Sequence, residues 1–530
     1  MVGAHRDGGD GAGDRRRRRL PGAAHYRRRE RRGADRGDRG GRVMSAWDQF
    51  HLIGPVVVLF GGAGALLTWD LVQPRRAPVL ALALLTLAAA FGYTLWHALT
   101  GSAGTAFDGA VVMDRFALFF AFLLIAVAAA VTVAATEFAR RSDNAAEFYA
   151  LLLVATGAMV LLTQANDLVS VFIALETTAI AQFVLAGIGR DARSSEAGLK
   201  YLLTGAVSAA VLLYGFALLF GLAGTTALPG IAAYVAAGHE ETRLALILAF
   251  VLVAAGLGFK MATAPFHAWV PDVYQGAPTP VTSFLAVASK AAAFAVVLRV
   301  FYAGLGGGGT IISHDWSALF AVVAGVSMTF GNTAAILQTD VKRLLAYSSI
   351  AQAGNIAVGL AAVAAGSTIG PSGVLFFLGT YTAANLGVFI AVIAVSERIG
   401  SDEMRDYAGL LRRSPWLASI LVLCLLSLTG IPPTAGFLAK LYIFNGAVQA
   451  GEPWLVWLVV VAVLNTAVSA FYYLRWARTI VLDEPLEGTS ITAALPVQGL
   501  LTLAAAGVLF FGLVPAPLIS AAQRAAEALQ

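Results

Sequence analysis

The chain has 530 residues, of which 58% are hydrophobic and 13% are charged, compared with about 25% charged in an average soluble domain. This composition excludes an ordinary soluble protein, and the single cysteine, Cys424, excludes an internal disulfide and any metal or iron–sulfur site built from this chain's cysteines alone. The net charge of +5 arises at one end, because residues 1–43 contain 14 Arg and six acidic residues and leave 22 basic and 25 acidic residues for the rest.

Residues 1–43 form an Arg- and Gly-rich segment with no apolar run and no helical periodicity. The segment therefore matches neither a signal peptide nor an amphipathic transit peptide, and we expect it to be disordered. Two interpretations are open. It is either a basic tail that contacts anionic lipid or nucleic acid, or an extension upstream of a true start at Met44.

From Met44 onward, apolar stretches predict an all-α polytopic membrane protein with about 14 transmembrane helices, because about 20 apolar residues cross a bilayer as a helix. An N-terminal group within 44–136 contains the first three helices: 52–72, 78–98 and 115–136. The next five lie within 147–303: 147–164, 167–188, 197–221, 244–270 and 279–303. Five more lie within 316–478: 316–338, 343–364, 372–396, 416–448 and 454–478. The last helix is expected at 495–520.

Basic residues orient this bundle, because cytoplasmic connections carry an excess of Lys and Arg. With the N-terminus outside, the odd-numbered connections contain fifteen basic residues: Arg75, Arg76, Arg140, Arg141, Arg190, Arg193, Lys200, Lys342, Arg343, Arg398, Arg405, Arg412, Arg413, Arg475 and Arg478. The even-numbered connections and the C-terminus contain four: Arg115, Arg243, Arg299 and Arg524. We therefore expect cytoplasmic odd-numbered connections and both termini outside. The Arg-rich segment would then have to be translocated, which favours Met44 as the start.

The remaining three basic residues, Lys260, Lys290 and Lys440, lie inside predicted helices, and Glu176 is their acidic counterpart. Glu176 lies nine residues into its helix and Lys290 eleven residues after Thr279, which places them about 14 and 17 Å deep at 1.5 Å per residue. Ionisable residues at such depth are costly and usually mark ion or proton paths. The alternatives are static buried ion pairs or lysines that reach an interface, and depth argues against the latter for Glu176 and Lys290.

Two predicted helices, 244–270 and 416–448, are too long for one span, and each contains helix breakers beside its lysine. The breakers are Gly256, Gly258 and Pro265 around Lys260, and Gly430, Pro432 and Pro433 before Lys440. Interrupted helices in two halves of a chain indicate a transport site in an inverted repeat, and a simple packing kink is the alternative. His267 follows Lys260 by seven residues, so we expect it on the same helix face, either exchanging protons or ending the helix.

Motifs around these residues complete a recognisable pattern over about residues 50–520. They are GLGFK (256–260), PFHAWVPDVYQGAP (265–278), ASK (288–290), ALE (174–176), Glu196 with Lys200-Tyr201, KRLLAYSSI (342–350), LTGIPP (428–433), Gly436-Phe437 and Lys440. Together they resemble the antiporter-like membrane subunits of bacterial NADH-quinone oxidoreductase, respiratory complex I. Tyr274-Gln275-Gly276 resembles chain N specifically. Lys440 stands where the chain M pattern has a glutamate, and the sequence lacks the long lateral helix of chain L.

This resemblance implies two inverted five-helix repeats, helices 4–8 (147–303) and 9–13 (316–478), with helices 7 and 12 broken. It implies proton translocation coupled to electron transfer from NADH to quinone, in which Glu176 modulates Lys260, Lys290 lies in a central axis and Lys440 faces a second half-channel. His267, Lys200 and Lys342 are candidate relay residues. Many members have a histidine where this chain has Gln352, so a proton path there would use water or another group.

The sequence has no Gly-x-Gly-x-x-Gly motif that opens a helix, no phosphate-binding loop and no cysteine framework. We therefore expect this chain to bind no cofactor and no metal, and NADH, FMN, Fe–S clusters and quinone to belong to the whole complex. The expected partners are the other membrane subunits of complex I and lipid, in a bacterial plasma membrane, and no nucleic acid. Two alternatives remain: a subunit of a stand-alone cation/proton antiporter, which genomic neighbourhood distinguishes, and a non-catalytic scaffold, which would need neither the lysines nor the broken helices.

Overall fold

The computed structural model describes residues 46–73, 76–485 and 490–529, so the expectations for residues 1–43 lie outside the described residues. Thirteen helices in this part of the chain are long and apolar enough to cross a membrane. The remaining predicted span, 416–448, is present as two shorter helices, α19 (Pro415–Thr429) and α20 (Ala435–Gln449). The prediction of an all-α polytopic membrane protein with about 14 spans is confirmed.

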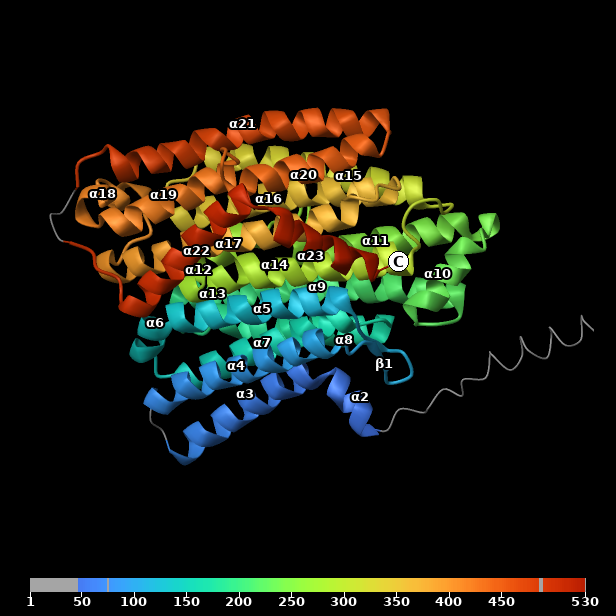
Figure 1. The fold of residues 1–530 in the computed structure, drawn as a ribbon, viewed down its shortest axis with the longest axis horizontal. Coiled ribbons are helices and arrows are strands. Elements are labelled where there is room, and N and C mark those ends of the chain that lie inside the picture. The colour runs from blue at the N-terminus through green and yellow to red at the C-terminus, as the bar shows by residue number, and fades with distance from the viewer. Residues whose placement is uncertain (1–45, 74–75, 486–489, 530) are drawn as a thin grey trace, which may run out of the picture. The chain divides into compact units, whose positions relative to one another are not determined.

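The N-terminal group of helices brackets a small β-hairpin that the sequence did not predict. Its elements are α2 (Ala46–Leu52), α3 (Gly54–Val72), α4 (Arg76–Thr100), β1 (Gly104–Ala106), β2 (Val111–Met113), α5 (Arg115–Ala134) and α6 (Thr136–Arg141). The two strands pair antiparallel, with Thr105 opposite Val112. The hairpin therefore closes the connection between α4 and α5 at one end of the bundle (Figure 1).

The middle of the chain contains the first broken helix and an unusually irregular helical segment. Its elements are α7 (Ala145–Gln164), α8 (Leu168–Ala186), α9 (Ala192–Ala223), α10 (Leu228–Ala236), η1 (Glu240–Thr242), α11 (Arg243–Met261), α12 (Val270–Gly276), α13 (Thr279–Phe284), η2 (Leu285–Ser289), α14 (Lys290–Val297) and η3 (Leu298–Gly304). The last four form one membrane-spanning segment, in which η2 and η3 are π-helical. Such π-helical turns often occur at functional sites.

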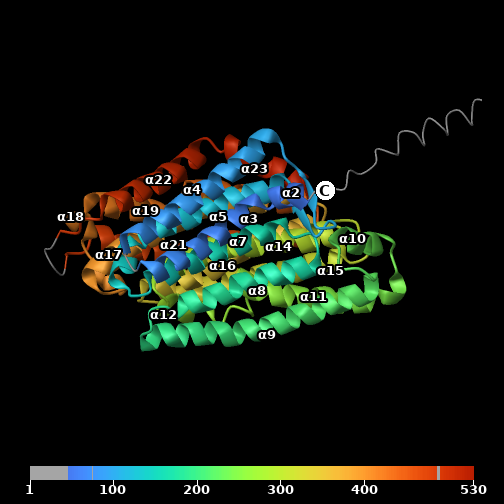
Figure 2. The same ribbon diagram turned by 90° about the horizontal axis from the view of Figure 1, so that it is seen from below.

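The C-terminal part contains the second broken helix. Its elements are α15 (Ser313–Ile336), α16 (Val341–Ala364), α17 (Gly370–Ile399), η4 (Met404–Tyr407), α18 (Leu410–Arg413), α19, α20, α21 (Pro453–Val481), α22 (Leu495–Leu513) and α23 (Ala516–Glu527). The last predicted helix, 495–520, is in fact two helices, because Pro515 disfavours helical geometry at Val514. From α3 onward the long helices run side by side with similar axes (Figures 1 and 2).

Capping aspartates fix where several spans begin. The side chains of Asp114, Asp167, Asp191 and Asp340 accept hydrogen bonds from backbone N–H groups in the first turns of α5, α8, α9 and α16. An aspartate at this position satisfies N–H groups that the helix itself leaves unpaired. The start of α8 therefore agrees with the depth assigned to Glu176, nine residues after Asp167.

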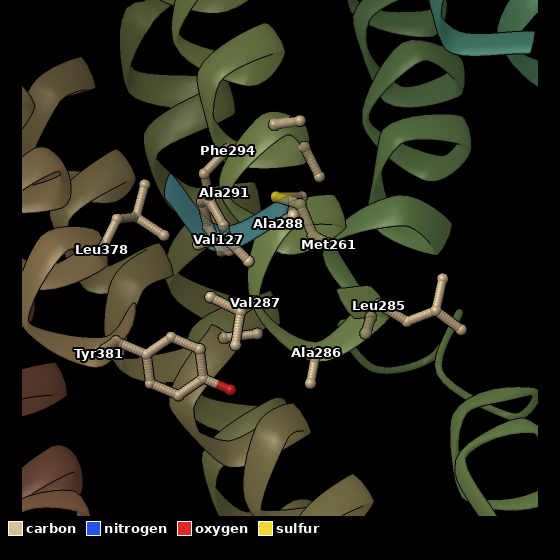
Figure 3. Packing of buried hydrophobic residues seen from close by; sticks show 14 of the residues in the cluster. Val127, Met261, Leu285, Ala286, Val287, Ala288, Ala291, Phe294, Leu378 and Tyr381 are labelled. Carbon is tan, nitrogen blue, oxygen red and sulfur yellow. The ribbon is translucent and has the colours of Figure 1, made fainter. Parts of the chain in front are cut away.

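The centre of the bundle is the segment from α13 to η3, which is buried along its whole hydrophobic stretch. Small side chains make close packing possible there. Figure 3 shows Val287, Ala288 and Ala291 between Tyr381 and Leu378 of α17 on one side and Met261 of α11 on the other. Lys290 lies in this fully buried segment, so its charge has no direct access to lipid.

Candidate functional site

The first break separates Lys260 from the helix that follows it. Helix α11 ends at Met261, and Ala262 adopts a left-handed conformation with φ of 61°. Gly256 and Gly258 lie before the break and serve packing, because a Cβ on Gly256 would crowd Leu212 of α9 and a Cβ on Gly258 would crowd Phe266. Backbone that leaves the helix at this depth is tolerated because protein surrounds it.

The Lys260 side chain is 8% exposed and lies among aromatic rings. Its Nζ is 5.3 to 5.9 Å from the ring centroids of Phe183, Tyr201 and Phe259, and it donates a hydrogen bond of 3.5 Å to Tyr201 Oη. Half-buried Glu176 interacts with Lys260 electrostatically, but within the described residues no carboxylate oxygen lies within 4.0 Å of Lys260 Nζ. The two groups therefore form a separated charge pair, in place of a closed ion pair.

A hydrogen-bonded connection leads from Lys260 towards Lys290. Tyr201 Oη donates to Gln182 Oε1 at 3.0 Å, and Ser289 Oγ donates to the same oxygen at 3.1 Å. Ser289 directly precedes Lys290. A cavity of about 10 Å³ lined by Lys260 and Ser289 has room for about one water molecule. Three uncharged polar side chains thus connect Lys260 to the residue directly before Lys290.

Lys290 is 1% exposed, and its Nζ donates to the backbone carbonyl of Ser349 in α16 at 2.5 Å. The hydroxyl of Ser349 lies 3.5 Å from the hydroxyls of both Tyr274 and Tyr381. Asn385 Nδ2 donates to Tyr381 Oη at 2.9 Å. Within the described ranges no carboxylate lies within 4.0 Å of Lys290 Nζ, so neutral oxygens are its hydrogen-bond partners.

The second break places Lys440 against the end of another helix. Helix α19 ends at Thr429, and Gly430 follows with φ of 91°. Lys440 is 6% exposed, and its Nζ donates to the Thr429 carbonyl at 2.8 Å and to Thr466 Oγ1 at 3.4 Å. The lysine thus uses a carbonyl that the interrupted helix leaves without an internal partner.

Gln352 lies between the Lys290 and Lys440 regions. Its Nε2 donates to the Leu428 carbonyl at 2.9 Å and lies 3.5 Å from Tyr473 Oη. A cavity of about 10 Å³ is lined by Gln352, Tyr381 and Lys440, and it again has room for about one water molecule. Gln352 therefore offers hydrogen bonds along this route, although it cannot titrate.

These groups form what we call the polar axis. Its members are Glu176, Lys260, Tyr201, Gln182, Ser289, Lys290, Ser349, Tyr381, Gln352 and Lys440. The sequence alone pointed to the four charged members and to Gln352, but not to Tyr201, Gln182, Ser289, Ser349 and Tyr381 as site residues. Gln182 in an otherwise apolar stretch of helix was the available signal.

The expectation for His267 was wrong in its geometry. Because α11 ends at Met261, the helical period that placed His267 on the face of Lys260 does not continue to residue 267. The imidazole instead lies against Phe330 of α15, with ring centroids 4.4 Å apart.

Lys200 lies in a charged network at one end of the bundle. Its Nζ is 2.7 Å from Glu196 and 2.7 Å from Asp272, and Arg343 also contacts Asp272 at 2.8 Å. Asp272 lies in the connection between two membrane-spanning segments. Burial raises the pKa of the Asp272 carboxyl, but hydrogen bonds from Lys200 and Arg343 outweigh this effect, so the pKa lies below its ordinary value. This network anchors α12 to α9 and α16.

Lys342 lies at the same end, where it lines a cavity of about 470 Å³. Its Nζ donates to the Ala277 carbonyl at 2.7 Å and lies 3.8 Å from Asp402. Glu397 lines the same cavity, and within the described residues its buried Oε1 has no hydrogen-bond partner. Glu397 does not stand out in the sequence, because a glutamate near a helix end is usually solvated. Across the described ranges, no group of three His, Cys, Asp or Glu side chains is placed to hold a metal ion.

Comparisons with known proteins agree on one family. Residues 165–466 match the family described as NADH:quinone oxidoreductase/Mrp antiporter, TM. NADH-quinone oxidoreductase subunit N of Desulforamulus reducens is 42% identical over 80% of this chain and 87% of that protein. NAD(P)H-quinone oxidoreductase subunit 2 of a Synechococcus species is 46% identical over 72% of this chain and 70% of that protein.

Solved structures give the same result for the fold. A chain of respiratory complex I from Thermus thermophilus with bound Aureothin is 34% identical, has a TM-score of 0.74, and covers 88% of this chain and 98% of its own length. A chain of the Mrp complex from Dietzia sp. is 20% identical with a TM-score of 0.79, over 90% of this chain and 97% of its own, and shows the fold alone.

Proposed function

Since this chain belongs to the subunit N family of NADH-quinone oxidoreductase, within the NADH:quinone oxidoreductase/Mrp antiporter membrane proteins, we propose that its polar axis is the route along which it moves protons. The chain is a proton-translocating membrane subunit of a multi-subunit respiratory complex that transfers electrons from NADH to quinone. NADH, FMN, Fe–S clusters and quinone belong to the whole complex. A stand-alone antiporter subunit is less well supported, because the likeness to the Mrp complex is 20% identical.

The observation that carries the proposal is the series of neutral hydrogen-bonding groups that lies between three buried lysines. Tyr201, Gln182 and Ser289 link Lys260 to the residue before Lys290, and Tyr381 and Gln352 lie between Lys290 and Lys440. A static structural charge would need only a local counter-charge. A series of donors and acceptors with two small cavities provides places through which a proton can pass by way of single water molecules.

The separation of Glu176 from Lys260 gives the axis a means of control. At an effective dielectric of 20, the attraction between two unit charges falls from about 4 kcal/mol at 4 Å to about 1.7 kcal/mol at 10 Å. Moving Glu176 relative to Lys260 over this range therefore changes the stability of the protonated lysine by about 2.3 kcal/mol. Such a change alternately holds and releases the Lys260 proton.

Odd-numbered connections gather at one end of the bundle, and we assign this end to the cytoplasm because of its excess of basic residues. The 470 Å³ cavity that contains Lys342 and Glu397 is lined by residues from five of these connections, and we assign it as the vestibule for proton uptake. The described C-terminal end lies at the opposite end, beside α10 and the β1–β2 hairpin (Figure 1). On this assignment the C-terminus is external. Two inverted repeats, at 147–303 and 316–478, are part of the same proposal.

The assembled complex with Lys260 replaced tests the proposal. If Lys260 carries a proton, Lys260→Ala leaves assembly largely intact and depresses both NADH-driven proton uptake and coupled quinone reduction. Lys260→Arg is also defective, because a guanidinium keeps its proton. A static charge predicts the reverse ranking, in which Lys260→Arg is nearly silent and Lys260→Ala destabilises the subunit by stranding Glu176.

The measurement is pH-gradient formation in inverted membrane vesicles after addition of NADH, with assembly checked on native gels. Arg478→Lys, at an exposed residue outside the polar axis and outside the 470 Å³ cavity, is the control and keeps wild-type pumping. Full pumping by the Lys260→Arg complex would refute the carrier role.

A further inference from the structure

A large apolar groove runs along one lateral face of the bundle. It has a volume of about 1070 Å³ and is bordered by α4, α5, α17, α22 and α23. Figure 2 shows α4, α5, α22 and α23 together along one side. Its lining is almost entirely hydrocarbon, with Phe119, Phe122, Leu386, Phe510 and Leu518 among small alanine and glycine residues. A groove this apolar and large favours an amphiphile or another protein surface over water.

The two charged residues among the groove's described lining residues are both arginines, Arg115 and Arg524. Arg115 is the first residue of α5, and Arg524 lies in the last turn of α23, which packs against α5. Both arginines are exposed. Positive charge therefore gathers at one end of a groove that is otherwise uncharged.

These arginines differ from the other two basic residues assigned to the same side of the membrane. Arg243 pairs with Asp315 at 2.7 Å, and Arg299 pairs with Asp114 at 2.7 Å. Within the described residues, neither Arg115 nor Arg524 has a carboxylate oxygen within 4.0 Å. The neighbouring Asp114 is unavailable to Arg115, because its oxygens already bind Arg299 and the N–H of Ala117.

We propose that this groove binds one anionic phospholipid, whose acyl chains lie along α5 and α22 and whose phosphate is held by Arg115 and Arg524. Guanidinium groups bind phosphate oxygens through bidentate, charge-assisted hydrogen bonds, so two arginines at one end of an apolar groove suit an anionic headgroup. The charge pattern matches this ligand, with cations at one end and hydrocarbon along the rest. A helix from a neighbouring subunit would need carboxylates at the same end to complement both arginines.

The test uses the purified complex reconstituted in phosphatidylcholine vesicles that contain a photoactivatable phosphatidylglycerol with the reactive group in its acyl chain. Crosslinked peptides are then mapped by mass spectrometry. We expect labelling of α5 and α22 peptides that exceeds labelling by the equivalent phosphatidylcholine probe. In Arg115→Gln/Arg524→Gln the phosphatidylglycerol labelling of these peptides falls at least about fivefold, the factor that corresponds to ~1 kcal/mol for one basic residue near an anionic headgroup.

A matched control is Arg398→Gln/Arg478→Gln, which removes two exposed arginines that do not line the groove. This control keeps the wild-type labelling of α5 and α22. Equal labelling by both lipids in the wild-type complex would overturn the proposal, and so would unchanged labelling in Arg115→Gln/Arg524→Gln. Failure of both probes to reach the groove would mean that a partner subunit occupies it and would also overturn the proposal.

Discussion

Gln182 bridges Tyr201, which contacts Lys260, and Ser289, which directly precedes Lys290. Its carboxamide oxygen accepts from both Tyr201 and Ser289, and the residue is fully buried. A buried donor that loses its acceptor costs about 1–3 kcal/mol. Replacing this one residue therefore interrupts the polar axis without touching any charge.

We expect Gln182→Leu to reduce NADH-driven proton uptake about tenfold, the factor that corresponds to about 1.4 kcal/mol. Leucine is similar in size but cannot accept from Tyr201 or Ser289, so these hydroxyls lose their shared partner. Proton uptake by membrane vesicles is measured together with the amount of assembled complex. Gln449→Leu, at an exposed glutamine outside the axis, is the control and keeps wild-type uptake. Normal uptake in Gln182→Leu would exclude this connection as the route.

Some site residues stand out in the sequence, whereas others become apparent only in the folded chain. Glu176 and Lys290 could be identified from the sequence, because an ionisable residue in the middle of an apolar stretch is costly and therefore unusual. Gln182 and Ser289 were not found, because their role depends on α8, α9 and η2 meeting in space. His267 was placed wrongly because the end of α11 falls between it and Lys260.

At the scale of elements, the break between α19 and α20 is held by close backbone contact. The amide of Gly436 donates to Ser427 Oγ at 3.1 Å, and a Cβ at this position would overlap the carbonyl oxygen of Ser427. The contact sets where α20 begins and therefore where Lys440 meets the end of α19. The prolines and Gly430 predicted a break here, but the need for glycine at residue 436 follows only from the folded backbone.

Gly436→Ala is therefore expected to push α20 away from α19, with a cost of about 1–3 kcal/mol that is typical of overpacking. The amount of assembled complex falls, and the remaining complex pumps fewer protons for each NADH oxidised. Native gels and proton-to-NADH ratios in vesicles provide the readout. Gly61→Ala in α3 is the matched control, since nothing lies within 4 Å of a Cβ there. Equal behaviour of the two variants would contradict this account of the break.

At the scale of the whole molecule, hydropathy predicts the spans well because each must match the same hydrocarbon thickness. It does not predict the β1–β2 hairpin or the separate helix α23, whose positions depend on packing at the ends of the bundle. It also did not predict the groove between α5 and α22, because a groove exists only when several helices are assembled.

The orientation of the bundle can be tested with single cysteines, because the native Cys424 is buried. Arg398→Cys lies in an odd-numbered connection and Ala103→Cys in an even-numbered one, and both positions are exposed. We expect a membrane-impermeant maleimide to label Ala103→Cys from outside intact spheroplasts, and Arg398→Cys only in inverted vesicles. The parent chain is the unlabelled control. The opposite pattern would reverse the assigned topology.

The polar axis crosses the bundle at nearly constant depth, which determines where the membrane voltage acts. Glu176 lies nine residues from Asp167 and Lys440 nine from Gln449, or about 14 Å from helix ends at the hairpin end of the bundle. Lys290 lies eleven residues from Thr279, or about 17 Å from the opposite end. A charge does electrical work only when it changes depth, about 2.3 kcal/mol for each 100 mV across the whole membrane. Steps between the lysines are therefore nearly electrically silent, and the voltage opposes only proton uptake from one face and release at the other.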